Sequence, residues 1–461
     1  MIVRHHHARS SPSTRHDRCV RSRGRKAAAV VGKVTAALLA AAVLCGAAPA
    51  DAQAPSVPGV PGVDGAGSGE RPDARASSAP PRSAADRAPR YGPAARVAPG
   101  VVFRTFETSG LGGPVRGDLL EVDLRDPRVS VGLLRPPVIA ARRTVSAMAN
   151  AQRAVGGING DFFNISETHA GVVPTGSSSG PEVDGGRPLK GAVPDGQRFG
   201  PALPPTTSAE DVIGVGADRR ARVARLHLSG TIRSGEVSLA LRGLNQYALP
   251  VGGAGAFTGA WGTVSRQRAV CGTDTVRGAP CSTETAEVTV RRGVVTEVAD
   301  KVGEGPIPPG TTVLVGREQA ARTLRTLRPG DRANVRYRFT GARRLRFAVG
   351  GFPILRDGAP LAGLDAAGPA PRTAAGVGRA GRRLYLVVVD GRSERSGGVT
   401  VAELAALLGR AGADDAVNLD GGGSSTFVVR GPGEPAATVR NAPSDGTERP
   451  VANGIGVFTR P

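Results

Sequence analysis

The sequence predicts an α+β fold with mixed β-sheets, flanking helices, a βαβ unit near the C-terminus and a β-rich inserted subdomain. Three observations support this prediction. Apolar and polar residues alternate with a period of two at 119–124 and 129–133, as in half-buried strands. An apolar strand, a helix and a second strand follow one another between residues 384 and 419. Short strand-like runs separated by turns fill residues 211–346, with one helix predicted at 318–327.

The first 52 residues have the pattern of an export signal. Basic residues precede an apolar stretch at 27–43, and small residues follow at 48–52. The apolar stretch is short and Ala-rich for a bilayer span of about 20 residues. We therefore expect a secreted or cell-wall-associated protein with no stable membrane insertion after cleavage; an uncleaved anchor is the alternative.

Residues 53–100 predict a disordered linker, because they are rich in Pro, Gly, Ala and Ser and show no apolar periodicity. The folded domain is then expected to cover residues 101–461, with 211–346 as the β-rich insertion. Before this insertion, a helix is predicted at 144–155 and a Gly/Pro-rich loop region at 171–205.

The chain is strongly basic, with a formal net charge of +21. Residues 1–52 hold nine basic and two acidic residues, which leaves +14 on the remainder. Aromatic residues make up only 3% of the chain, so stacking platforms for single-stranded nucleic acid are not expected. The charge favours anionic cell-envelope polymers as partners and no nucleic acid. Biased Arg usage in the genome is the competing explanation.

Cysteine usage agrees with export. Cys19 and Cys45 lie in the predicted signal, and Cys271 and Cys281 flank a Gly- and Pro-containing loop. In an oxidising compartment these two are expected to form a disulfide. A zinc pair is the weaker alternative, because no His or further Cys lies near them in the sequence.

The C-terminal region places two carboxylates after two strands. The apolar run 384–389 ends at Asp390, and the strand 416–419 ends at Asp420. Between them, Thr400 and Glu403 fit a capping box that starts a helix. If both strands share a sheet, they are expected to run parallel with a right-handed crossover. Their carboxyl ends then meet at one sheet edge, where ligands bind in such folds.

Three glycines and two serines follow Asp420. Consecutive glycines let a backbone turn its N–H groups toward an anion and let that anion approach closely. The alternative is a tight hairpin turn in which Asp420 serves the turn. The loop residues that we assign to substrate binding are Gly421, Gly422, Gly423, Ser424 and Ser425.

Other polar residues complete a site for cleaving a glycosyl bond. Asn159 and Asp161 follow the predicted strand 155–158 and join the same edge. One carboxylate can act as base or nucleophile while another stabilises oxocarbenium-like charge. Arg372 with Thr373, and Arg392, offer contacts to a phosphate. The structural alternatives are solvated surface arginines, a turn Asp at Asp390 and a loop-closing Asn at position 159.

Taken together, these segments resemble the phosphodiester glycosidase family. The resemblance covers residues 101–458 and is strongest over 347–458. The matching segments are GINGDFF at 157–163, GGFPIL at 350–355, PRTAAG at 371–376, VDGR at 389–392, NLDGGGSST at 418–426 and RPVA at 449–452.

The resemblance implies hydrolysis of a sugar-1-phosphodiester at the anomeric carbon, giving a free sugar and a phosphomonoester. It assigns catalytic positions to Asp420, Asp390 and Asn159, and phosphate binding to Arg372. The family's lysosomal member has Gly where this chain has Asp161, so Asp161 is assigned to substrate binding. No cofactor is required by the pattern; the oxygen ligands could hold a divalent cation, but no ligand spacing demands a metal. A binding module of the envelope without catalysis is the second hypothesis.

Overall fold

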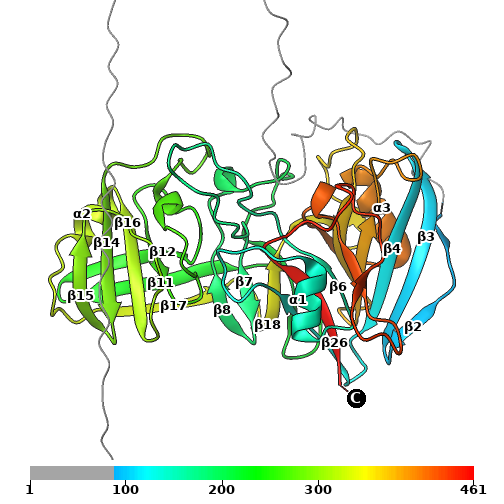
Figure 1. Ribbon diagram of the computed structural model, residues 1–461, viewed down its shortest axis with the longest axis horizontal. Helices are drawn as coiled ribbons and strands as arrows, with labels where there is room; N and C mark the ends of the chain where they lie inside the picture. Colours follow the sequence, from blue (N-terminus) through cyan, green and yellow to red (C-terminus); the bar gives the residue numbers. More distant parts are fainter. Residues whose placement is uncertain (1–87, 461) are drawn as a thin grey trace, which may run out of the picture. The chain divides into compact units, whose positions relative to one another are not determined.

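The computed structural model describes residues 88–460 (Figure 1). The export signal predicted at 1–52 and residues 53–87 of the predicted linker lie outside the described residues. Strands β1 (Arg90–Tyr91) and β2 (Ala95–Ala98) pair with β3 (Val101–Gly110). This end of the predicted linker is therefore part of a sheet.

The large sheet has nine strands, in the order β1-β3-β4-β22-β21-β23-β19-β20, with β2 also paired to β3. Every pair in it is antiparallel. Its remaining members are β4 (Gly113–Asp123), β19 (Phe352–Arg356), β20 (Ala359–Pro360), β21 (Arg372–Gly378), β22 (Arg383–Val389) and β23 (Asp415–Asn418).

Two five-stranded sheets pack against one face of the large sheet. The terminal sheet has the order β25-β24-β6-β26-β5, and the middle sheet has the order β10-β9-β18-β7-β8. Leu386 of the large sheet, Ile455 of the terminal sheet and Ile213 of the middle sheet lie in one buried apolar cluster. The terminal sheet comprises β5 (Val129–Leu134), β6 (Gly156–Asn159), β24 (Phe427–Val429), β25 (Thr438–Val439) and β26 (Gly454–Thr459). The middle sheet comprises β7 (Glu182–Asp184), β8 (Arg187–Lys190), β9 (Asp211–Gly216), β10 (Ala221–Arg225) and β18 (Leu345–Gly350).

The predicted insertion contributes to two sheets. Residues 227–340 form a seven-stranded sheet in the order β15-β14-β16-β13-β12-β11-β17 (Figure 1). β9 and β10, which the predicted range 211–346 includes, pair instead within the middle sheet. The seven strands are β11 (His227–Ser234), β12 (Val237–Leu244), β13 (Ala254–Phe257), β14 (Thr285–Arg291), β15 (Val294–Ala299), β16 (Thr311–Arg317) and β17 (Asn334–Thr340).

Helices are fewer than the predicted α+β class implies. Within residues 88–460, strands account for 42% of residues and helices for 9%, so the fold is mainly β. The described residues contain α1 (Val145–Gln152), α2 (Gln319–Leu324) and α3 (Val401–Ala411). The loop region predicted at 171–205 also contains β7 and β8. Periodicity missed these two short strands, because three and four residues are too few to establish an alternation.

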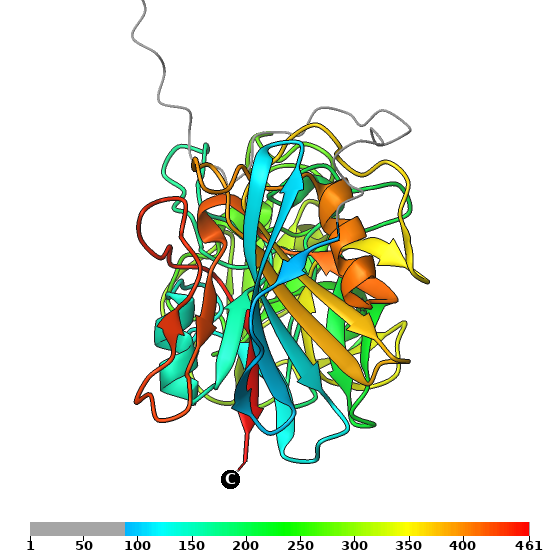
Figure 2. The ribbon, with the colours of Figure 1, turned by 90° about the vertical axis from the view of Figure 1, so that its right-hand side faces the viewer.

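The predicted strand–helix–strand unit is present as β22, α3 and β23. The capping box of Thr400 and Glu403 starts α3, and Gly412, with φ of 98°, ends it. Helix α3 lies on the other face of the large sheet, where Leu404 and Leu408 join the apolar cluster of Phe352 (Figure 2). Strands β22 and β23 run in the same direction, because each is antiparallel to β21, which lies between them.

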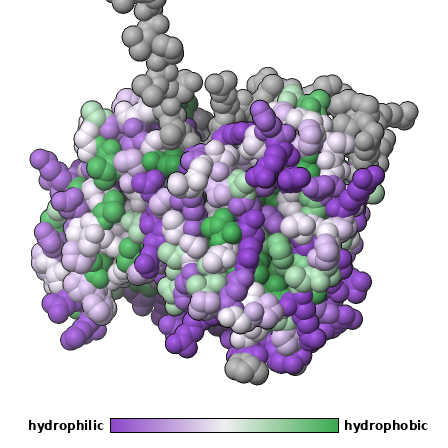
Figure 3. Space-filling model, turned by 45° about the vertical axis from the view of Figure 1, so that its right-hand side comes forward, coloured by the Kyte–Doolittle hydropathy of each residue, from purple (hydrophilic) through white to green (hydrophobic). Residues whose placement is uncertain are grey.

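No helix within residues 88–460 is long and apolar enough to cross a membrane. The face of the molecule in Figure 3 mixes hydrophilic and hydrophobic residues in small patches.

Candidate active site

Three strand ends meet at one edge of the large sheet. Arg372, the first residue of β21, pairs with Val389 at the end of β22, and Ala374 pairs with Asn418 at the end of β23. Asp390 and the loop after Asn418 therefore lie at the same edge, as the sequence predicts. The strand β21 between them adds Arg372 and Thr373 to this edge.

Asn159 ties this edge to the terminal sheet. It ends β6 and is fully buried. Its Nδ2 donates to the main-chain carbonyl of Asp420 at 2.6 Å, and its Oδ1 accepts from Thr373 Oγ1 at 2.8 Å. The same Oδ1 accepts from the backbone N–H of Thr426 at 3.0 Å. One side chain thus holds together three of the segments that resemble the family.

Asp420 is held rigidly within this network. Asp420 is 0% exposed, and its backbone N–H donates to the Gly160 carbonyl at 2.8 Å. Its own carbonyl accepts the amide of Asn159. The loop that carries the predicted essential carboxylate is therefore fixed on both sides by residues that follow β6.

The glycine loop uses several of its own N–H groups. Gly422 donates to the Pro371 carbonyl at 2.8 Å, and Ser424 and Ser425 donate to the carbonyls of Gly421 and Gly422 at 3.1 Å each. An anion at this loop would draw on the N–H groups of Gly421 and Gly423. Gly422 has φ of 57°, a backbone conformation that favours glycine.

The two predicted phosphate-binding neighbours face opposite sides of the sheet. Thr373 donates its hydroxyl toward Asn159 and lies 3.2 Å from Ser425 Oγ. Arg372 is also fully buried, but its Nε donates to the Val399 carbonyl at 3.0 Å, beside the start of α3. Its Nη2 donates to the Gly368 carbonyl at 2.7 Å and lies 3.4 Å from Asp365. Alternation along a strand places consecutive side chains on opposite faces, which explains the separation.

Asp390 is half-buried and fixed by the loop after β25. Its Oδ1 accepts from the Ala442 N–H at 2.9 Å and from Asn441 Nδ2 at 3.3 Å. Burial raises the pKa of Asp390, and these two hydrogen bonds oppose the rise. Arg392, two residues further on, is exposed with φ of 60°.

Asp161 lies in a separate buried cluster near the middle sheet. Its Oδ2 accepts from the Gly180 N–H at 2.5 Å, and a Cβ on Gly350 would lie 2.5 Å from the same oxygen. Burial raises the pKa of Asp161, while the N–H of Gly180 and the charge of Lys190 lower it. Lys190 is fully buried, its Nζ donates to the carbonyls of Gly180 and Gly191 at 2.7 Å each, and burial lowers its pKa to about 8.

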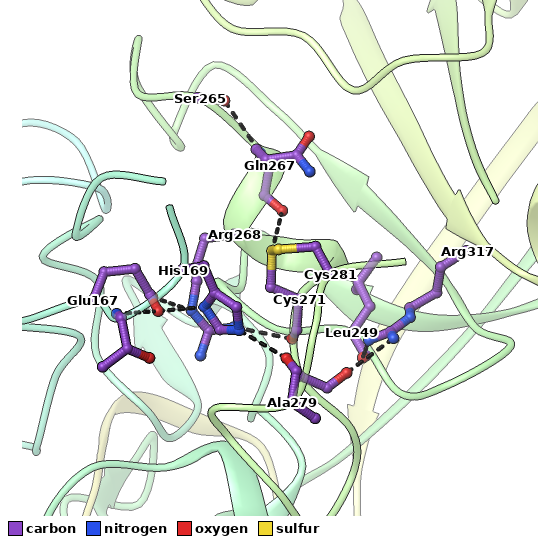
Figure 4. Close-up of a disulfide and its surroundings, with 12 residues drawn as sticks. Glu167, His169, Leu249, Ser265, Gln267, Arg268, Cys271, Ala279, Cys281 and Arg317 are labelled. Atoms are coloured by element: carbon purple, nitrogen blue, oxygen red, sulfur yellow. Dashed lines mark hydrogen bonds and ion pairs between the residues drawn. A yellow bond between two sulfur atoms is a disulfide. The ribbon is translucent and has the colours of Figure 1, made fainter. Parts of the chain in front are cut away.

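The predicted disulfide between Cys271 and Cys281 is confirmed (Figure 4). In space, unlike in the sequence, a histidine does lie near: ligand atoms of His169, Cys271 and Cys281 are within 4.8 Å of one another. The two sulfurs are joined, however, and His169 bonds Glu167 Oε1 at 2.5 Å and the Ala279 carbonyl at 2.7 Å.

Sequence reasoning missed several polar residues around these groups. Asn453 accepts the Asp161 N–H at 2.9 Å and donates to Glu182 Oε1 at 2.8 Å. Asp118 lies beside Asp390. The sequence does not mark it as a site residue, because it is a single acidic residue in a strand of alternating polarity. Asn441 bonds both Asp390 and the Ser425 carbonyl.

The arrangement defines a mainly β protein with buried carboxylates, amides and hydroxyls gathered at a sheet edge. Residues 284–458 match the family model described as phosphodiester glycosidase. The matched range includes Arg372, Asp390 and Asp420.

Two solved structures share the fold, and a third was also matched. A hypothetical protein from Synechocystis has a TM-score of 0.62 and 22% identity. The match covers 81% of this chain and 64% of that protein. A putative exported protein from Burkholderia pseudomallei has a TM-score of 0.61 and 20% identity, covering 83% of this chain and all of that one. The catalytic domain of zebrafish N-acetylglucosamine-1-phosphodiester α-N-acetylglucosaminidase, auto-inhibited by its propeptide, has a TM-score of 0.40 and 15% identity, covering 81% of this chain and 89% of that one. No curated protein matches the chain.

Proposed function

We propose that the protein is an exported hydrolase that cleaves a sugar-1-phosphodiester, giving a free sugar and a phosphomonoester. Its proposed substrates are glycosyl phosphodiesters of the cell envelope, such as N-acetylglucosamine-1-phosphate linkages. The phosphodiester glycosidase domain supports the reaction type. The pattern of residues 1–52 and the surplus of Arg support the location and the anionic partner.

One observation carries the proposal: Asn159 joins the segments of Thr373, Asp420 and Thr426 through three hydrogen bonds. Asp420 and Thr426 belong to one segment and Thr373 and Asn159 to two others, and all three segments belong to the pattern that resembles the family. A buried amide that satisfies a hydroxyl, a carbonyl and an N–H at once fixes their relative positions, as a catalytic arrangement requires.

Each residue has a proposed role in the reaction. Asp420 is the essential carboxylate and Asp390 its partner, one acting as base or nucleophile and the other stabilising positive charge at the anomeric carbon. The phosphate leaves with the electrons of the broken C–O bond, and water supplies the new hydroxyl of the sugar. Arg372, predicted to bind the phosphate, is buried on the α3 side of the sheet and bonded to Val399 and Gly368, so its charge acts on a phosphate only at a distance. A phosphate leaving group needs little protonation, so a strong general acid is not required.

The test compares Asp420→Asn with the full chain. A synthetic sugar-1-phosphodiester is incubated with each protein, and the free sugar and the phosphomonoester are both quantified. We expect Asp420→Asn to lose at least about 100-fold in kcat while its thermal midpoint stays close to that of the parent. Asp300→Asn is the matched control, because the Asp300 side chain is 81% exposed on the seven-stranded sheet region. Full activity of Asp420→Asn would refute the assignment.

The same experiment addresses the second hypothesis of a binding module. Salt-sensitive affinity for isolated envelope glycans, with no release of sugar from any diester by the parent chain, would favour binding without catalysis.

A further inference from the structure

A groove of about 470 Å³ opens beside Asp390, at the end of β22 and along β3 and β4. Asp118 and Asp390 line it together with Arg116 and Arg440. Tyr91 and Thr105 contribute from β1 and β3. The groove therefore combines hydrogen-bond acceptors and donors in one place.

Asp118 is the unusual member of this groove. It lies on β4 in register with Thr105 of β3 and Val388 of β22. Because side chains two residues apart share a face, Asp118 and Asp390 point to the same side of the large sheet. Asp118 is 4% exposed, and within residues 88–460 no hydrogen bond or ion pair reaches its carboxyl group. Its oxygens are not among the fully enclosed unpaired atoms of these residues, so the carboxyl group opens onto the groove, where a ligand can bond it.

Asp390 connects the groove to the candidate active site. Asn441 Nδ2 donates to Asp390 Oδ1 at 3.3 Å and to the Ser425 carbonyl at 3.0 Å. Ser425 Oγ lies 3.2 Å from Thr373 Oγ1, which bonds Asn159. A molecule bound in the groove would touch Asp390, which Asn441 links to the Ser425 carbonyl of the glycine loop.

The charges around the groove limit what it can take. Asp118, Asp390 and Glu107 disfavour a phosphate, and Arg90, Arg116 and Arg440 disfavour a bare cation. Arg116 pairs with Glu107 at 3.1 Å, and Arg440 bonds Glu434, so the charges of these two arginines are partly balanced. A neutral group with several hydroxyls fits these partners, because hydroxyls both donate and accept hydrogen bonds.

We propose that this groove is a sugar subsite, in which Asp118 and Asp390 accept hydrogen bonds from hydroxyls of a glycosyl unit. Asp118 is then a specificity-determining residue, since a site built to bond hydroxyls discriminates strongly against ligands that lack them. The inference deepens the proposed function and rests on it for the nature of the substrate. Sugar binding in the groove can be measured without turnover.

The full chain is titrated at pH 8 with glucose and, separately, with N-acetylglucosamine. Binding is measured by saturation-transfer NMR and by calorimetry. We expect one of these sugars to bind and Asp118→Asn to weaken that binding at least tenfold. Asp118→Leu, which removes both oxygens, should weaken it as much, while Asp300→Asn should bind as the parent does. Equal affinity in the parent and Asp118→Asn, or no binding of either sugar to the parent, would overturn the subsite.

Kinetics separate this proposal from the proposed function. If Asp118 selects substrate, Asp118→Asn raises KM for a sugar-1-phosphodiester and leaves kcat within about twofold. An unchanged KM in an active enzyme would overturn the subsite and leave the function standing. Sugar binding that depends on Asp118 in a chain without turnover would support the subsite and refute the function.

Discussion

The side-chain amide of Asn159 donates a hydrogen bond of 2.6 Å to the main-chain carbonyl of Asp420, across 261 residues of sequence. This contact joins the end of a strand in the terminal sheet to the loop that follows β23 in the large sheet. The position of the predicted essential carboxylate therefore depends on a residue from the first half of the chain.

Asn159→Ala is expected to lower the free energy of unfolding by about 3 kcal/mol, because it leaves three buried groups without their partner. Denaturant unfolding followed by fluorescence measures the change. Asn334→Ala, at an exposed position on β17, is the control and should change stability by less than about 0.5 kcal/mol. A parent-like midpoint for Asn159→Ala would contradict the structural role of this amide.

Gly423→Ala is expected to displace the ion pair next to the glycine loop and to reduce activity. A Cβ at this position would lie 2.1 Å from Asp445 Oδ2 and 2.2 Å from Arg449 Nη2, which form an ion pair of 2.5 Å. Because both atoms are at the ends of flexible side chains, we expect a loss of only about 1–2 kcal/mol in stability and a larger loss in kcat.

The control for this substitution is Gly409→Ala within α3. The nearest atom to a Cβ there is 3.8 Å away, so Ala should be accommodated and should stabilise the helix by about 1 kcal/mol. A Gly423→Ala enzyme with parent kinetics would show that the ion pair of Asp445 and Arg449 is not needed for the reaction.

Asp118→Asn should make the protein more stable above pH 7. Burial, and then the charge of Asp390, raise the pKa of Asp118 to about 7, while the charge of Arg440 opposes the rise. Because the pKa of this carboxyl group is higher in the folded protein than in the unfolded chain, its protonated form contributes to stability. This contribution is fully present below the pKa of the unfolded chain and is lost as pH rises through about 7. From the size of this shift, the loss in the parent approaches about 4 kcal/mol.

Thermal unfolding between pH 4 and pH 8 tests this expectation. The parent should lose stability relative to Asp118→Asn over this range, and the two proteins should be closest at pH 4. Parallel stability curves across the whole range would show that Asp118 titrates normally.

Removing the disulfide should destabilise the loop between β13 and β14. Cys271 and Cys281 are separated by 10 residues, and closing a loop of this length contributes about 2.5 kcal/mol in the chain-entropy account. The double substitution Cys271→Ser with Cys281→Ser should therefore lower the unfolding midpoint. Dithiothreitol should lower the unfolding midpoint of the parent to that of the variant and leave the midpoint of the variant unchanged. A parent midpoint that does not respond to reductant would contradict the expectation.

Local patterns were sufficient to predict much of the C-terminal half. The capping box at Thr400, the apolar run before Asp390 and the strand before Asp420 all depend on residues close in sequence. Their common sheet edge followed from the chirality and length of the strand–helix–strand connection. The excess of helices in the predicted fold class arose because short, separated strands leave weaker signals than amphipathic helices.

By itself, the sequence determined the strands around the site, the disulfide and the set of polar residues that resemble a phosphodiester glycosidase. Only the tertiary structure decided how these residues group. It turned Arg372 toward α3 and Thr373 toward Asn159, placed Asp118 beside Asp390, and enclosed Asp161 with Lys190. These pairings depend on strand register and on contacts between sheets, which join residues from 27 to more than 200 positions apart and leave no periodic trace in the chain.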